Sequence, residues 1–107
     1  TPTKFMNTQR IEMLKKLVLE DPADPFYPYA LALEYIHTKR EEALSILIEV
    51  INKHAEYLPS YYQAGLLSIE LGKLEEGQKI LEKGINLAQK QNDRKAFNEL
   101  RSLLDNI

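Results

Sequence analysis

The side chains best suited to acid–base or metal chemistry in this chain are two histidines and two pairs of neighbouring glutamates. His37 and His54 are the only histidines, and the 107 residues include no cysteine. A zinc site needs several ligands that converge on one point, whereas these histidines fall late on two different predicted helices. Glu41-Glu42 and Glu75-Glu76 recur at one position of a repeated pattern, so we interpret them as solvated residues that the helix dipole favours. The sequence therefore predicts no metal site and no pair of catalytic carboxylates.

Other catalytic patterns are also missing from the sequence. It contains no Gly-rich phosphate-binding loop, no serine or cysteine nucleophile in a recognisable setting, and no zinc-ligand spacing. We therefore expect that the protein is not an enzyme, that it has no catalytic residues and that it needs no cofactor.

Composition narrows the classes of partner. The chain is 44% hydrophobic and 28% charged with a net charge of -2, which is ordinary for a globular domain. A nucleic-acid-binding domain usually carries a basic patch, and no apolar run approaches the length of a membrane span. The start of the chain lacks the apolar core of a signal peptide, so we expect one cytoplasmic domain that binds neither nucleic acid nor membrane.

Because the chain opens with Thr1, Met6 is one candidate for the natural start, and a fragment of a longer protein is the other interpretation.

The stretch 61–87 determines how the chain is organised. Its apolar and small residues are three or four positions apart, which places them on one face of each of two helices. Gly72 separates the two helices and suits a left-handed cap, so we predict an antiparallel hairpin. Gly65 and Gly77 inside the helices predict a close approach of the two backbones. The alternative is sequence drift, in which glycine occurs at these positions only because they tolerate it. The two sets are Tyr61, Ala64, Gly65, Leu67 and Ser68, then Leu74, Gly77, Leu81, Gly84 and Ile85.

The same pattern occurs one period earlier in the chain. Residues 32–36 align with 65–69 at a spacing of 33, and residues 41–44 align with 75–78 at a spacing of 34. A helix–turn–helix period of this length is typical of a helical solenoid. The sequence therefore predicts an all-α fold. In the earlier copy, Asp24 and Pro25 resemble an N-cap and a first helical position, but we expect Pro28 to delay the start of the regular helix to Pro28 itself. This helix then runs to about Thr38 and is followed by a paired helix at 40–53.

Further helices are predicted at both ends. The first follows a cap at Asn7 or Thr8 and ends near Glu20, before Asp21-Pro22. We interpret it as the second helix of an incomplete repeat, and a membrane-surface helix is the less favoured alternative because its basic residues are few. The last helix follows Asp93 and has one apolar stripe, which predicts a cap on the preceding repeat. A dimerisation helix is the alternative interpretation.

The repeated residues resemble a known family. One copy has Leu31-Ala32, Tyr35, Ala43 and Leu47, and the other has Tyr61, Ala64-Gly65, Gly77 and Leu81, with Asp21-Pro22 in phase. This order resembles the tetratricopeptide repeat family, although Pro28 and Ser68 depart from its pattern. The resemblance implies a single domain over 1–107, a right-handed α-solenoid of antiparallel helix hairpins with about six helices. We assign 5–21 to a half-repeat helix, 22–55 and 56–89 to two repeats, and 93–107 to a C-terminal capping helix.

The resemblance also implies a binding site. In such a solenoid the first helix of each pair lines the concave side. Family members that bind acidic peptide C-termini carry Lys, Arg and Asn at several of these positions, and here the residues are mainly apolar. We therefore predict a protein-interaction module whose apolar groove binds an amphipathic helix or an apolar extended segment. A homodimer whose groove is filled by its own subunit is the alternative, and burial of the same residues in the core is another. The predicted partner-binding residues are Phe26, Tyr29, Leu33, Ile36, Tyr62, Gln63, Leu66 and Ile69.

Overall fold

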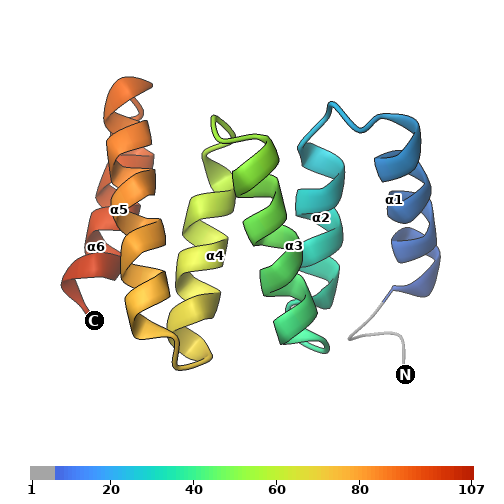
Figure 1. Cartoon of the computed structure of the whole chain (residues 1–107), viewed down its shortest axis with the longest axis horizontal. Coiled ribbons are helices and arrows are strands. Elements are labelled where there is room, and N and C mark those ends of the chain that lie inside the picture. The colour runs from blue at the N-terminus through green and yellow to red at the C-terminus, as the bar shows by residue number, and fades with distance from the viewer. Residues whose placement is uncertain (1–6) are drawn as a thin grey trace. The chain divides into compact units, whose positions relative to one another are not determined.

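The structure, a computed structural model, describes residues 7–107, so Met6 and the start of the predicted half-repeat helix lie outside the described residues. Among the described residues there is no strand. The prediction of an all-α fold with about six helices is confirmed (Figure 1). The helices are α1 (Thr8–Glu20), α2 (Phe26–Tyr35), α3 (Arg40–Lys53), α4 (Pro59–Glu70), α5 (Leu74–Lys90) and α6 (Arg94–Asp105).

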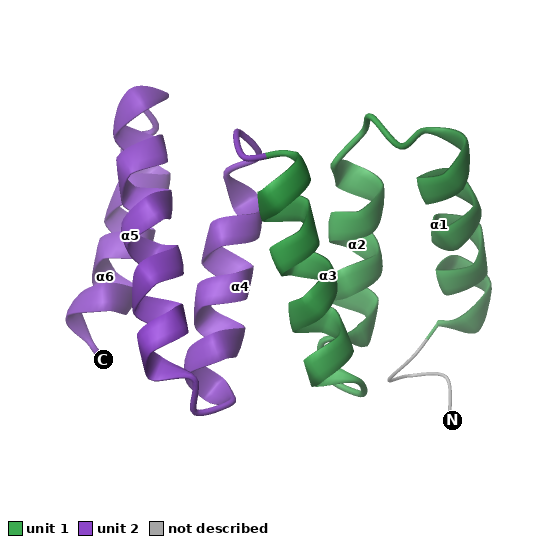
Figure 2. Ribbon diagram, in the orientation of Figure 1, with its two compact units in different colours: residues 1–54 green, residues 55–107 purple. Residues whose placement is uncertain are grey.

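The helices form two compact units, residues 1–54 and residues 55–107 (Figure 2). In the first unit α2 contacts both α1 and α3, and in the second unit α5 contacts both α4 and α6. Helices that follow each other within a unit run antiparallel because the turns between them are short (Figure 1). Each unit is therefore a helical hairpin with one further helix against it.

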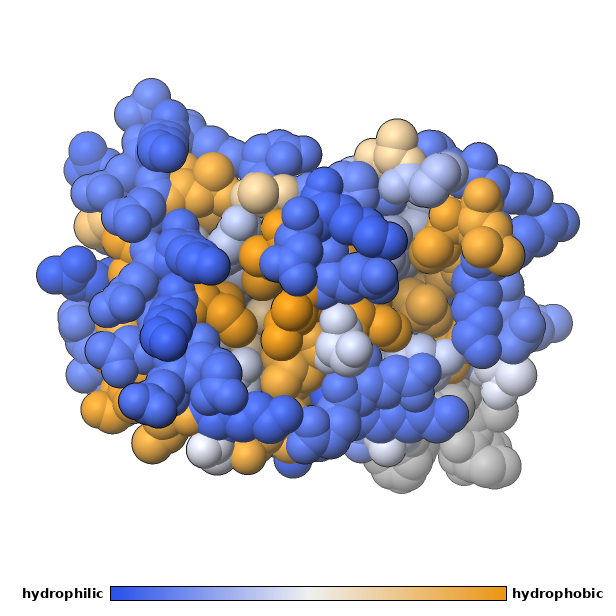
Figure 3. All heavy atoms as spheres, viewed as in Figure 1, coloured by the Kyte–Doolittle hydropathy of each residue, from blue (hydrophilic) through white to orange (hydrophobic). Residues whose placement is uncertain are grey.

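Each unit has its own apolar core. Burial of one large aliphatic side chain stabilises a fold by about 1.5–3 kcal/mol, so a few inward-facing residues are enough to hold each helix in place. Apart from Leu74 at its start, the exposed positions of α5 are polar, and Figure 3 shows mostly hydrophilic atoms over this helix. The core of the first unit consists of Ile11, Leu14, Ala30, Leu31, Ala32, Tyr35, Ala43, Leu44, Leu47 and Val50. The core of the second consists of Leu58, Tyr61, Ala64, Leu67, Leu81, Ile85, Ala88 and Leu100.

The start and end of α2 differ from the prediction. The helix begins at Phe26 rather than Pro28, because the first intrahelical bond runs from the Tyr29 N–H to the Pro25 carbonyl, 3.1 Å away. Pro28 therefore lies in the first turn, where an N–H has no helical acceptor, and its missing donor costs nothing. The helix ends at Tyr35 rather than near Thr38, because the Ile36 N–H donates to the Leu33 carbonyl and the Thr38 N–H to the Tyr35 carbonyl, bonds that span three residues instead of four.

Two helices of the second unit end in the same capping motif. Gly72 has a positive φ of 82°, and the Lys73 N–H donates to the Ser68 carbonyl at 2.8 Å. Asn92 takes the equivalent place after α5 with a φ of 57°, and the following N–H donates to the Ala88 carbonyl at 2.9 Å. This bond from the second residue beyond the cap back to the last turn defines a Schellman motif. The predicted role of Gly72 is confirmed.

The glycines inside α4 and α5 lie where the two helices approach closely. A Cβ atom on Gly77 would lie 3.2 Å from the Gly65 carbonyl oxygen, and one on Gly65 would lie 2.5 Å from Leu81 Cδ2. A Cβ on Gly84 would lie 2.8 Å from Tyr61 Cβ. Side chains at these positions would push α5 away from its neighbours, which outweighs the cost of glycine in a helix of about 1 kcal/mol. The packing explanation of Gly65 and Gly77 is confirmed.

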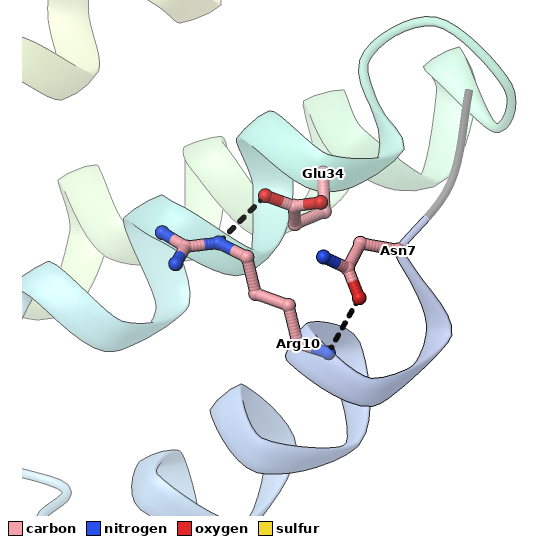
Figure 4. Close-up of polar contacts among 3 residues, drawn as sticks. All are labelled: Asn7, Arg10 and Glu34. Atoms are coloured by element: carbon pink, nitrogen blue, oxygen red, sulfur yellow. Dashed lines mark hydrogen bonds and ion pairs between the residues drawn. The ribbon is translucent and has the colours of Figure 1, made fainter. Parts of the chain in front are cut away.

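The docking of α1 onto α2 combines apolar burial with one ion pair. Asn7 caps the helix as predicted, with its Oδ1 accepting the Arg10 N–H at 3.0 Å. The Arg10 Nε donates to Glu34 Oε2 on α2 at 2.8 Å, so the first turn of α1 is tied to α2 (Figure 4). Ile11 and Leu14 are the buried residues of α1.

Candidate functional site

The helix α2 has almost no polar residues. Its only charged side chain is Glu34, which is occupied by the ion pair to Arg10. Most helices of globular proteins carry a polar face toward solvent, and a helix that is apolar on all sides is expected to be buried on all sides. Where such a helix has an open side, apolar groups are exposed to water.

One side of α2 is open. Its inward positions Ala30, Leu31, Ala32 and Tyr35 are buried. Phe26 is 47% exposed. The remaining large residues of the open side are half-buried, and with Phe26 they follow the spacing of three and four that defines one helix face. We call this surface the α2 face; it consists of Phe26, Tyr29, Leu33 and Ile36.

The second unit has a similar surface on α4. The inward positions of this helix are buried, including Tyr61, Ala64 and Leu67. The outward positions are half-buried and carry three apolar residues and one carboxamide. The only charged residue of α4, Glu70, lies at the last position of the helix. We call this surface the α4 face; it consists of Tyr62, Gln63, Leu66 and Ile69.

Of the eight residues predicted to bind a partner, four lie on the first unit and four lie on the second. None of them is buried, and none carries a charge. The members of the α4 face lie on one helix, and those of the α2 face lie on α2 and at Ile36, the residue that follows its last turn. Whether a partner uses them stays a proposal.

Hydrogen bonds at one end of the second unit hold α4 in place. The Tyr61 hydroxyl donates to the Ala55 carbonyl at 2.6 Å, and the Gln91 side chain donates to the Glu56 carbonyl at 2.9 Å. These bonds tie the segment before α4 to α4 itself and to the end of α5. Burial raises the pKa of the Tyr61 hydroxyl above its ordinary 10.0, and the negative charge of Glu56 raises it further.

The residues with potential for catalysis stay apart. His37 lies in the turn after α2, rather than late on a helix as predicted, and His54 caps the far end of α3. The 14 residues of α3 separate them by about 20 Å, at 1.5 Å of rise per residue. Within residues 7–107 no group of three or more His, Cys, Asp or Glu side chains is arranged to hold a metal ion. None of the helices in that range is both long and apolar enough to span a bilayer.

A pocket of about 420 Å³ lies at the turn between α5 and α6. It contains none of the eight predicted residues, and no site predicted from the sequence includes it. The signal in the sequence is the pair Asn92-Asp93, where a left-handed residue precedes a helix cap whose Oδ1 accepts the Ala96 N–H. The lining residues are Ala88, Gln89, Asn92, Asp93, Arg94, Phe97 and Asn98.

Solved structures with the same fold decide the family. A tetratricopeptide repeat domain protein from Salinibacter ruber, solved in solution, is 30% identical to this chain with a TM-score of 0.73. The alignment covers 78% of this chain and 86% of that one. The chain belongs to the tetratricopeptide repeat family. A crystal structure of a tetratricopeptide repeat domain protein from Salinibacter ruber agrees, with 29% identity, a TM-score of 0.72, and coverage of 76% of this chain and 91% of that one.

A more distant solved structure shows the likeness of fold alone. The crystal structure of MamA has a TM-score of 0.64 at 21% identity, over 90% of this chain and 67% of that one. No family model matches the sequence, and no curated protein matches it. The tetratricopeptide repeat fold is in general a helical-repeat fold for protein–protein interaction.

Proposed function

We propose that this tetratricopeptide repeat protein binds a protein partner through the α2 face and the α4 face, without catalysis and without a cofactor. The proposed ligand is an amphipathic helix or an apolar extended segment. Tyr29 of the α2 face and Tyr62 of the α4 face are the aromatic residues that would anchor it. A cytoplasmic setting, expected from the composition, stays a prediction and is part of the same proposal.

The observation that carries the proposal is the composition of α2. A helix that needed only to be soluble would carry charged residues at Tyr29, Leu33 and Ile36, where side chains are half-open to water. Apolar residues gathered at such positions mark interaction surfaces, because a partner that covers them removes the apolar area from water. The α4 face supports the same interpretation, with Gln63 offering a carboxamide that can bond to a peptide main chain.

The lack of charged residues on the two faces favours an apolar ligand over an acidic one. None of the eight positions is Lys or Arg. A carboxylate placed there would lose its hydration without gaining a charged partner, which costs several kcal/mol in the manner of an unpaired buried ion. We therefore expect apolar segments to bind and acidic C-termini to bind weakly or not at all.

A second copy of the chain is the alternative occupant. Sedimentation over a range of concentrations separates the two possibilities. A monomer at all concentrations supports a foreign partner. Self-association is supported by a symmetric dimer that forms with increasing concentration and that Leu66→Lys or Leu33→Lys dissociates.

The proposal is tested by selecting ligands for the protein from a random peptide library. The wild type should enrich peptides with clustered apolar residues, and the variant with both Leu33→Lys and Leu66→Lys should retain none of them. Each substitution places a charge in the proposed contact. Either one alone should therefore raise the dissociation constant of the selected peptides by about 10-fold or more, corresponding to about 1.4 kcal/mol of binding free energy.

The same chain supplies matched controls. Leu19 on α1 is 82% exposed and Leu74 at the start of α5 is 50% exposed, and neither belongs to the two faces. Leu19→Lys and Leu74→Lys therefore make the same chemical change elsewhere on each unit and should leave binding unchanged. Far-UV circular dichroism reports whether each variant keeps its helices. If Leu33→Lys or Leu66→Lys unfolds the protein, or if both leave peptide binding intact, the proposal is wrong.

A further inference from the structure

We draw no further inference here: the strongest candidate, the pocket of about 420 Å³ at the turn between α5 and α6, is lined mainly by exposed polar side chains around the first turn of α6, and no second observation among the described residues indicates a ligand for it.

Discussion

At the scale of single residues, the second unit contains two serines whose hydroxyls are buried without a partner. Ser60 and Ser68 on α4 are both 0% exposed, and no described group forms a hydrogen bond with either Oγ atom. A buried polar group without a partner costs about 1–3 kcal/mol, because it gives up its bonds to water and gains none in return. Ser68 also stands where the family pattern has a tyrosine.

Replacing Ser68 with alanine should therefore stabilise the protein. We expect the free energy of unfolding, measured by urea denaturation, to rise by about 1 kcal/mol or more. Ser45 on the exposed side of α3 provides a matched control, since Ser45→Ala gains only the difference in helix propensity, below about 0.5 kcal/mol. Equal effects of the two substitutions would mean that the Ser68 hydroxyl is satisfied in solution.

Tyr61 predicts a particular loss of stability at alkaline pH. Its pKa is raised in the folded protein, first by burial and then by Glu56, whereas in the unfolded chain it titrates near its ordinary 10.0. Above about pH 10 the folded state holds the proton that the unfolded state releases. The contribution of Tyr61 to the free energy of unfolding is therefore complete below about pH 10 and is lost as the pH rises through the pKa of the folded state.

The test compares the wild type with Tyr61→Phe in urea denaturation between about pH 8 and about pH 11. At the lower pH the variant should be less stable by about 1 kcal/mol, because it loses the bond to the Ala55 carbonyl. This difference should shrink above about pH 10 as the wild type weakens. A difference that stays constant with pH would show that Tyr61 does not titrate differently in the two states.

At the scale of elements, the attachment of α1 depends on the ion pair between Arg10 and Glu34. The Arg10 side chain is 51% exposed and the Glu34 side chain is 21% exposed, so solvent screens much of their attraction. A double-mutant cycle of Arg10→Ala and Glu34→Ala should give a coupling energy of about 0.5 kcal/mol, which falls in about 1 M salt. Hydrogen exchange of the α1 amides should quicken in each single variant.

Lys16 and Glu20 provide the comparison for this cycle. They form a pair within α1 at 4.0 Å, and both side chains are more than half exposed. Their coupling should be about 0.3 kcal/mol or less and should leave the docking of α1 unchanged. A coupling for Arg10 and Glu34 no larger than this would show that apolar contacts alone attach α1 to α2.

Much of the helical pattern could be predicted from the sequence because local rules determine it. The caps at Asn7 and Asp93, the glycine after α4 and the bounds of α3 follow from side-chain hydrogen bonds and from helix periodicity. The start of α2 could not be predicted in this way. Proline is tolerated throughout a first turn, so Pro28 alone does not show which turn is first. Asp24 and Pro25 mark the earlier of the two possible starts, and the Asp24 Oδ1, which accepts the Phe26 N–H at 2.9 Å, favours that start.

At the scale of the whole molecule, the candidate site could be predicted only in part. Helical spacing identified which residues share a face with Leu33 and which share a face with Leu66. Spacing does not distinguish an apolar face in a core from one that is half-open, because both have the same periodicity. The degree of burial depends on which neighbouring helices cover the face, and this is a property of tertiary packing. The pocket beside Phe97 was missed for a related reason, since its lining combines the end of α5 with the start of α6, and tertiary packing brings these together.

The most direct test of a partner-binding role is methyl NMR of the protein during titration with a peptide selected by the wild type. The proposal predicts that shifts concentrate on the methyl groups of Leu33 and Ile36 in the first unit and of Leu66 and Ile69 in the second. The methyl groups of Leu19 and Leu74, which are exposed but lie outside the two faces, should not move. Saturable shifts at Leu19 or Leu74 with none at the four predicted residues would contradict the proposal.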